Sequence, residues 1–286
     1  MNTSPLSIPY WHIDAFADQA FAGNQAAVMV LDEWLPDDVL VAIGAENMFA
    51  QTAFVVRDET GEADWELRWC TPTYEIALCG HATLAAGHVL LGLDADNGGG
   101  DAGAERITFR TRQSGILEVR RADVGGADGG YEVGLPAIAT HPEPYAEAAA
   151  LLGAEPVLVH RNDTLYNIFL YENEAQIRAL EPDLKALGAF GVEQFACTAP
   201  SDRTDIVSRV FVPGAGVDED SVTGSAHAAL APFWAERLGR STFTAHQASE
   251  RGGDLTLRLE SGVAGDRVWL GGACVTVVEG RFHLTG

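Results

Sequence analysis

Two segments of small apolar residues constrain the fold of this chain more than any other feature. One segment runs from His81 to Leu91 and the other from Ala226 to Leu238. Both have the length of a helix, and their apolar residues lie nearly all round it rather than along one stripe. A helix of this kind is usually buried, because no face of it suits water. We therefore expect one buried helix in each half of the chain.

Alternating residues and short apolar runs predict strands in both halves of the chain. These strands cover residues 10–16, 26–31, 52–57, 65–70, 106–112 and 116–121, and then 157–160, 166–171, 194–198, 206–212, 255–259, 267–270 and 274–279. Further helices are expected at 37–47, 174–180 and 182–187. Loops are expected at 71–76 and 214–220, a break at 98–100, and a glycine-rich linker at 125–130.

The two buried helices begin in a similar way. Residues 79–86 (CGHATLAA) and 223–230 (TGSAHAAL) share a glycine, an alanine and a later alanine in the same register. Each stretch follows an acid-containing loop and precedes further strands, so the order of elements repeats as well. This order indicates an internal duplication. A chain of 286 residues has room for two domains, each with its own core.

Paired helix starts of this kind suit the binding of a small carboxylate. The N-terminus of a helix presents unpaired N–H groups and partial positive charge, and a glycine there lets a ligand approach the backbone closely. Two such starts facing each other across a cleft would hold an anion without a lysine or arginine. The short polar side chains of Cys79, His81, Thr223 and Ser225 would then reach the atom next to the carboxylate. Ordinary helix caps are the alternative interpretation, since threonine and serine cap helices routinely.

The charge of the chain excludes several classes of partner. It has 18 basic and 41 acidic residues, which gives a net charge of −23. A protein this acidic repels nucleic acid and anionic membrane surfaces, so we expect neither as a partner. The expected partner is a small-molecule carboxylate, whose charge the protein has to neutralise locally.

Composition also argues against common cofactors. The single lysine, Lys185, lies in a short polar helix and is a poor candidate for the Schiff base of pyridoxal phosphate. The four cysteines show no paired Cys-x-x-Cys spacing, so we expect no zinc or iron–sulfur site. The N-terminal residues lack the features of a signal peptide, and no apolar run approaches the ~18 residues of a membrane span. The simplest location is the cytoplasm, with reduced thiols.

Five ordered segments resemble the phenazine-biosynthesis-like isomerases. They are residues 14–24 (DAFADQAFAGN), 51–55 (QTAFV), 79–83 (CGHAT), 219–227 (EDSVTGSAH) and 251–253 (RGG). The resemblance implies the α+β fold of diaminopimelate epimerase, with two similar domains that are each a curled sheet around a central buried helix. The halves are residues 1–130, with the central helix near 81–92, and residues 131–286, with the central helix near 225–238. The last strand is a candidate to return to the first domain.

The resemblance also implies an activity and a site. It implies a homodimer that needs no cofactor or metal and moves a proton on a small acid in the inter-domain cleft. The family's histidine falls on His81, its aspartate on Asp220 and its serine on Ser225. The family's asparagine falls on Asn24, although Gln25 replaces the proline that follows it. The remaining substrate-binding candidates are Gly80, Thr223 and Gly224 at the two helix starts.

The largest departure from the family pattern is Gln51, which stands where the family has its catalytic glutamate. A glutamate with a raised pKa can take a proton from carbon and return it elsewhere, whereas a glutamine amide only forms hydrogen bonds. Gln51 is therefore expected to hold the substrate. Either Cys79 or Asp220 then moves the proton. Cys79 aligns with a catalytic cysteine of diaminopimelate epimerase and proline racemase, and a helix N-terminus favours its thiolate.

Three functions follow from these residues. The first is a cofactor-independent isomerase acting on a small carboxylic acid. The second is a catalytically altered protein of the same fold that only binds its ligand. The third is a racemase or epimerase that uses Cys79, although the second cysteine of those enzymes would fall on Thr223. The alternative to a catalytic Cys79 is that this residue is a buried and inert small hydrophobe.

Several other polar residues have structural interpretations. Glu46, near the end of the helix at 37–47, is expected to be a solvated carboxylate. His227, inside the second buried helix, is expected to be a satisfied core residue. Cys70, Cys197 and Cys274 lie in strand-like runs and are expected to be core residues.

Overall fold

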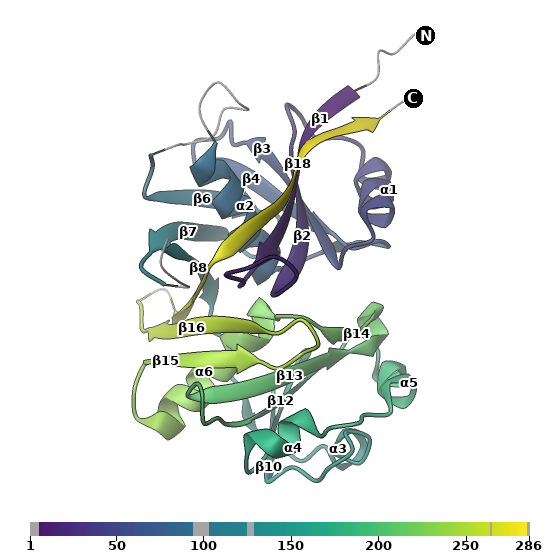
Figure 1. The fold of residues 1–286 in the computed structure, drawn as a ribbon, viewed down its shortest axis with the longest axis vertical. Helices are drawn as coiled ribbons and strands as arrows, with labels where there is room; N and C mark the ends of the chain where they lie inside the picture. The colour runs from purple at the N-terminus through teal and green to yellow at the C-terminus, as the bar shows by residue number, and fades with distance from the viewer. Residues whose placement is uncertain (1–5, 94–102, 125–128, 264, 285–286) are drawn as a thin grey trace. The chain divides into compact units, whose positions relative to one another are not determined.

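The chain forms two compact units in a computed structural model (Figure 1). The first unit consists of Met1–Gly134 together with Gly271–Gly286, and the second consists of Leu135–Leu270. The structure describes residues 6–93, 103–124, 129–263 and 265–284. The expected break at 98–100 and residues 125–128 of the expected linker lie outside this range.

The first unit is built on one curled sheet. Its strands are β1 (Leu6–Ala15), β2 (Asn24–Val30), β3 (Gln51–Arg57), β4 (Trp65–Cys70), β5 (Glu75–Ile76), β6 (Arg106–Thr111), β7 (Ile116–Ala122), β8 (Gly130–Pro136, which crosses the unit boundary) and β18 (Cys274–Leu284). The strands pair in the order β18–β1–β2–β3–β4–β6–β7–β8, and β5 also pairs with β4. The β2–β3 and β4–β6 pairs are parallel, and the other pairs are antiparallel. The C-terminal strand β18 thus lies beside the N-terminal strand β1 (Figure 1).

Helix α2 (Gly80–Gly92) lies inside this sheet. Eleven of its 13 residues are buried. It packs against strands from the beginning and the end of the sheet, β1, β2 and β3 on one side and β6 and β7 on the other. Contact with both ends shows that the sheet curls around the helix, as predicted.

Helix α1 (Asp37–Asn47) covers the other face of β2 and β3. Leu40 and Ile43 of this helix pack against Met29 and Phe54 in one apolar cluster. Side chains alternate between the two faces of a strand. Because Met29 and Phe54 face α1, the residues of opposite parity, which include Asn24 and Gln51, lie on the face that carries α2.

The second unit repeats this plan. Its strands are β9 (His141–Pro142), β10 (Leu158–Arg161), β11 (Tyr166–Leu170), β12 (Gln194–Pro200), β13 (Ile206–Val212), β14 (Val217–Asp220), β15 (Thr242–Gln247), β16 (Gly253–Glu260) and β17 (Arg267–Gly272, which crosses the unit boundary). Its helices are α3 (Ala146–Ala149), α4 (Glu174–Arg178), α5 (Leu184–Leu187) and α6 (Gly224–Leu238), with 3-10 turns at Gly188–Phe190 and Pro213–Ala215. Ten residues of α6 are buried, and the helix packs against β11 and β16.

Strand order and direction are the same in the two units. The series β2–β3–β4–β6–β7 alternates parallel and antiparallel pairs, and β11–β12–β13–β15–β16 alternates in the same way. A short strand, β5 or β14, precedes the buried helix in each series. This repeat agrees with the internal duplication predicted from the two helix starts.

Most predicted elements are present, and the errors concern two loops, three strands and one short helix. The segment 214–220 is not a loop, because its last residues pair with β13 as β14, and the loop at 71–76 contains the two-residue strand β5. Strands β8, β9 and β15 and helix α3 were not predicted. These elements are defined by pairing or packing with other segments, which the local residue pattern does not encode.

A substitution at Gly87 on α2 would test how tightly this helix packs inside the first sheet. A Cβ atom at this position would lie 2.4 Å from Cγ1 of buried Val119 on β7. We predict that Gly87→Ala lowers the free energy of unfolding by about 1–3 kcal/mol through overpacking, although alanine is the better helix former. Gly92→Ala, where a Cβ meets nothing, is the matched control and should keep or raise stability.

Denaturant titration followed by circular dichroism would measure both variants. Combining Gly87→Ala with Val119→Ala should recover part of the loss, because the two sites are coupled. A stable Gly87→Ala protein would contradict close contact between α2 and β7.

Candidate functional site

The buried helix of the first unit begins at Cys79, with Gly80 and His81 in its first turn. Cys79 is the N-cap residue, in extended backbone conformation, and its side chain makes no capping hydrogen bond. Gly80 and His81 are both buried. The first amides of a helix have no partner within the helix, so this end presents N–H donors and partial positive charge in a region shielded from water.

Three side chains meet at this helix start. The amide nitrogen of Asn24 donates to Nδ1 of His81 over 3.2 Å, and Sγ of Cys79 lies 3.6 Å from the same nitrogen. All three residues are at most 5% exposed. Since Nδ1 accepts from Asn24, the proton of a neutral His81 ring is on Nε2. The structure thus brings together three of the residues that the sequence selected.

Gln51 is the first residue of β3 and shares a sheet face with Asn24. Its neighbour in the parallel β2–β3 register is Ala26, two residues after Asn24. Oε1 of Gln51 is buried and has no hydrogen-bond partner among the described residues. An unpaired buried acceptor costs about 1–3 kcal/mol. Unpaired buried polar atoms are rare in native proteins, which makes Gln51 a candidate contact for a bound ligand.

The buried helix of the second unit begins in the same manner at Thr223, followed by Gly224 and Ser225. Thr223 is the N-cap residue in extended conformation, and its side chain makes no capping hydrogen bond, although threonine is a favoured cap. Gly224 and Ser225 are buried. The hydroxyl of Ser225 accepts from Nε2 of Gln194 over 3.3 Å. Gln194 begins β12 as Gln51 begins β3, so glutamines occupy equivalent positions in the two units.

Asp220 ends β14, immediately before this helix start, and is partly buried. Its carbonyl oxygen accepts from Nε2 of Gln247, which is completely buried at the end of β15. Oε1 of Gln247 accepts from the amide of Thr223 over 2.8 Å. Sequence analysis missed Gln247 and Gln194, because nothing in the local pattern separates a buried glutamine from a solvated one.

The predicted site residues thus form two groups, one in each unit. Asn24, Gln51, Cys79, Gly80 and His81 gather at the start of α2. Asp220, Thr223, Gly224 and Ser225 gather at the start of α6.

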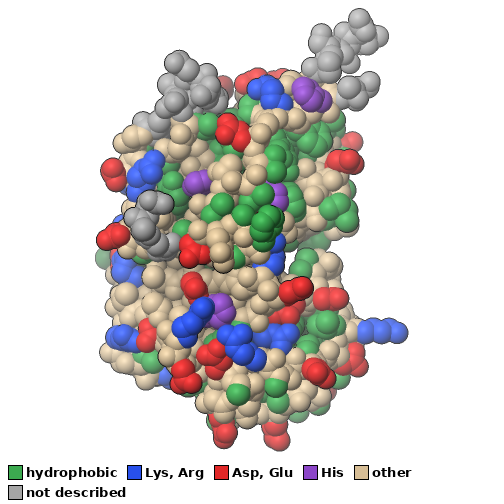
Figure 2. All heavy atoms as spheres, in the orientation of Figure 1, with side chains coloured by type: hydrophobic (Ala, Val, Ile, Leu, Met, Phe, Trp, Pro, Cys, Tyr) green, Lys and Arg blue, Asp and Glu red, His purple; other side chains and the backbone are tan. Residues whose placement is uncertain are grey.

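The guanidinium of Arg209, on the strand beside Asp220, is already paired with a carboxylate. Arg209 donates to both carboxylate oxygens of Glu219, each over 2.8 Å, and these hydrogen bonds raise the pKa of the guanidinium despite its burial. Figure 2 shows acidic and basic side chains interspersed over the face that it draws. No group of three or more His, Cys, Asp or Glu residues within the described ranges could hold a metal ion. Of the helices in that part of the chain, none has the length and apolar character needed to cross a membrane.

The residues with structural interpretations lie as expected, with one exception. Glu46 is exposed, and Cys70 and Cys197 are buried. His227 is completely buried, and burial lowers its pKa to about 4. Cys274 is only partly buried by surface area, because β18 lies at the surface, yet burial of its thiol raises the pKa to about 12.

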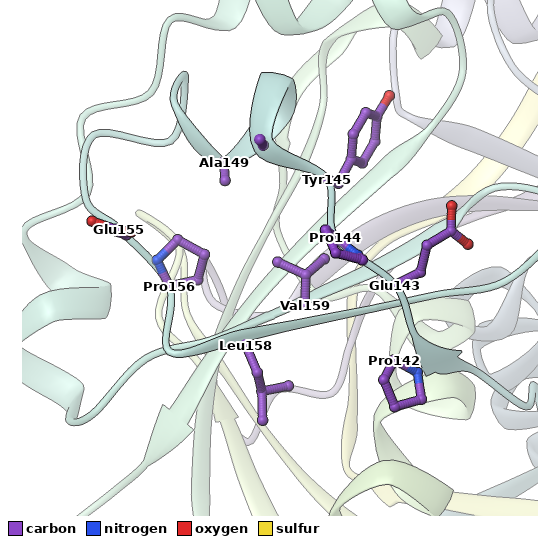
Figure 3. Close-up of a pocket in the computed structure, with 10 residues that line it drawn as sticks. Pro142, Glu143, Pro144, Tyr145, Ala149, Glu155, Pro156, Leu158 and Val159 are labelled. Carbon is purple, nitrogen blue, oxygen red and sulfur yellow. The ribbon is translucent and has the colours of Figure 1, made fainter.

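A separate pocket of about 410 Å³ lies in the second unit (Figure 3). It is lined by residues of the segments 142–149 and 155–159, among them three prolines. None of the predicted site residues lines it. Its wall is mostly apolar, and its titratable side chains, Glu143, Tyr145 and Glu155, are not among the residues at either helix start, so we do not assign the reaction to it.

Comparison with known proteins gives consistent matches over the chain. The profile of the phenazine biosynthesis-like protein family matches residues 13–280. An uncharacterized isomerase of Pseudomonas aeruginosa is 42% identical over 98% of this chain and 100% of its own length. The crystal structure of a phenazine biosynthesis protein of the PhzF family from Enterococcus faecalis is similar with a TM-score of 0.84 and 36% identity, covering 98% of this chain and 100% of that one.

A more distant structure shows the same fold. A hydroxyproline epimerase from Agrobacterium vitis has a TM-score of 0.60 at 10% identity, over 98% of this chain and 93% of that one. The α+β fold of two similar domains, predicted from the sequence, is confirmed by these structures and by the repeated strand order.

Gln51→Glu tests the environment of the unpaired acceptor. A buried carboxylate there is disfavoured, so its pKa should lie above the usual ~4.3 of glutamate. The folded variant then holds its proton to a higher pH than the unfolded chain does. Its free energy of unfolding therefore falls as the pH rises from the pKa of the unfolded chain to the pKa of the folded one. We predict near wild-type stability at about pH 4 and a loss of about 1–2 kcal/mol at about pH 8.

Denaturant titrations of wild type and variant across this pH range would measure the difference. Gln113→Glu is the matched control, because Gln113 is exposed and the same change should cost less than about 0.5 kcal/mol at every pH. A Gln51→Glu variant whose stability follows that of the control would show that the acceptor is solvated.

Proposed function

The chain belongs to the phenazine biosynthesis-like protein family, and we propose that within it this protein is a cofactor-independent isomerase that moves a proton on a small carboxylic acid. The observation that carries the proposal is the pair of buried helix starts whose N-cap side chains, Cys79 and Thr223, make no capping hydrogen bond. The name of the Pseudomonas aeruginosa relative, an isomerase, agrees with this reaction class.

In the proposed site the two helix starts bind the substrate carboxylate. Backbone N–H groups and the helix dipoles supply the attraction, which a chain with a net charge of −23 has to generate locally. Gly80 and Gly224 allow the carboxylate to come close to the backbone. Ser225 and Thr223 add hydroxyl donors. The proposal includes the prediction that both starts line one cleft between the domains.

The proton transfer is assigned to the first group of residues together with Asp220. A base takes a proton from a carbon that lies between the carboxylate and a carbon–carbon double bond. The negative charge spreads onto the carboxylate held by the amides and along the double bond, the double bond shifts by one position, and a proton returns to its far carbon. Cys79 is the favoured base, because the helix start favours a thiolate and Nδ1 of His81, 3.6 Å from Sγ, is an acceptor for the thiol proton. Asp220 is the alternative base, and Gln51 offers its buried carbonyl oxygen to a donor on the substrate.

Two other functions remain candidates on specific observations. Gln51 in place of the family glutamate favours a protein that binds its ligand without turning it over. The contact of Cys79 with His81, together with the fold shared with a hydroxyproline epimerase, favours a cysteine-based racemase or epimerase. The homodimer and the cytoplasmic location stay predictions.

Hydrogen exchange from solvent into candidate substrates tests the function. Wild type, Cys79→Ala and Gln51→Glu would be incubated in heavy water with a panel of small carboxylic and amino acids, and the mass of each compound followed. We expect a gain of about one mass unit with wild type and its loss in Cys79→Ala, because the thiolate is the base. Thr198→Val, a buried change on β12, controls for loss of stability alone.

The other outcomes separate the candidates. Exchange only with Gln51→Glu would mean that the natural protein binds rather than catalyses. Exchange that survives Cys79→Ala would move the base to another residue, with Asp220→Asn as the next variant. Exchange that leaves the structural isomer unchanged but inverts the configuration would identify a racemase or epimerase. No exchange with any variant or compound would count against the isomerase.

A further inference from the structure

Thr223, at the start of α6, is held by two buried side chains. Its amide donates to Oε1 of Gln247 over 2.8 Å, and its hydroxyl oxygen accepts from Nε2 of Gln247 over 3.2 Å. Its carbonyl oxygen accepts from Nδ1 of His227 over 2.8 Å. Gln247 and His227 are both 0% exposed. Only the hydroxyl proton of Thr223 has no acceptor among the described residues.

The amide of Gln247 fixes both ends of the segment that leads into α6. Besides its bonds to Thr223, its Nε2 donates to the carbonyl oxygen of Asp220 over 2.6 Å. The hydroxyl of Ser249 donates to the carbonyl oxygen of Ser221, between the two anchors. The backbone of Asp220 and Thr223, both candidates of the proposed site, is therefore set from β15 and the loop that follows it.

His227 has one tautomer in this arrangement. A carbonyl oxygen only accepts, so Nδ1 carries the proton that it donates to Thr223. Nε2 is then an acceptor, and the hydroxyl of Ser208 lies 3.3 Å from it as the donor. Burial lowers the pKa of His227 to about 4, so the ring stays neutral and keeps this pattern near pH 7.

These bonds decide what the hydroxyl of Thr223 can do. An N-cap threonine usually accepts from an amide of the first turn, but Gln247 supplies the donor here and the helix amides stay uncapped. A hydroxyl has a single proton, which is left to donate outward. We propose that Gln247 and His227 are positioning residues that hold Thr223 as a hydrogen-bond donor to the substrate carboxylate. This inference rests on the proposed function. It adds a reason why Thr223, which is neither an acid nor a base, stands at the start of α6.

Four variants test the inference with the acid that gains deuterium in the heavy-water panel. Thr223→Val removes the donor and should raise KM by roughly 10-fold to 100-fold, the effect of losing a hydrogen bond to a charged group. Thr223→Ser keeps the donor and should stay within a few-fold of wild type. Thr198→Val removes a buried hydroxyl that accepts from Trp234, about three helical turns along α6 from Thr223, and should change stability but not KM.

Gln247→Glu gives a signature that a purely structural role would not produce. An ionised carboxylate cannot donate to Thr223, so at pH 8 the KM of this variant should match that of Thr223→Val. Its protonated form has one proton, which Thr223 and the carbonyl oxygen of Asp220 share, so KM relative to wild type should recover in part as pH falls toward 5. A Thr223→Val variant with wild-type KM, or a Gln247→Glu variant whose pH profile parallels that of wild type, would overturn the inference.

A second measurement separates this inference from the proposed function. Amide hydrogen exchange of peptides covering residues 220–226 reports the hold of Gln247 without any substrate. We expect at least roughly 10-fold faster exchange in Gln247→Glu at pH 8 and no change in Thr198→Val. If no acid exchanges with wild type, the proposed function fails, and unchanged amide exchange in Gln247→Glu would overturn the positioning role independently. Should Gln247→Glu not fold, the Thr223→Val and Thr223→Ser pair decides.

Discussion

Burial of an apolar helix inside a curled sheet is the interaction on which the rest of this structure depends. Helices α2 and α6 have almost no polar side chain to place in water, so each is stable only when a sheet closes around it. Close approach demands small residues, and Gly87 against Val119 shows how little room is left. Enclosure also carries the first turn of each helix, with the partial positive charge of its N–H groups, out of bulk water. The packing that stabilises each domain thus also produces its polar end.

The sequence predicts this framework well because its signals are local. The two apolar helices, the helix at Asp37–Asn47 with its proline and acidic first turn, and the alternating strands are each visible within about ten residues. The glycine-containing helix starts also locate Cys79, His81, Thr223 and Ser225. Resemblance to a family adds Asn24, Gln51 and Asp220. The structure places Asn24 and Asp220 beside the helix starts, and Gln51 on the sheet face that carries α2.

What the sequence does not reveal depends on pairing between segments. Strand β14 is short and acidic, and it is a strand because it pairs with β13. Gln247 and Gln194 resemble any other glutamines until β15 and β12 carry them to the start of α6. Gln51 and Gln194 stand at equivalent positions of the repeat, which becomes visible only when the parallel registers of the two units are compared. Neutral amides at both positions leave the helix ends, rather than charged side chains, to provide the electrostatic attraction.

The antiparallel pairing of β1 with β18 has a consequence for how the protein is made. Both strands are long, and they come from opposite ends of the chain. The second unit, by contrast, is a continuous segment that leaves the ribosome before β18 does. During synthesis the second unit can therefore close first, while the N-terminal segment waits for its final strand with β1 unpaired on one edge. Such an edge invites pairing with other chains. The first unit therefore begins first during synthesis but is completed last, because its strand β18 is made after the whole second unit.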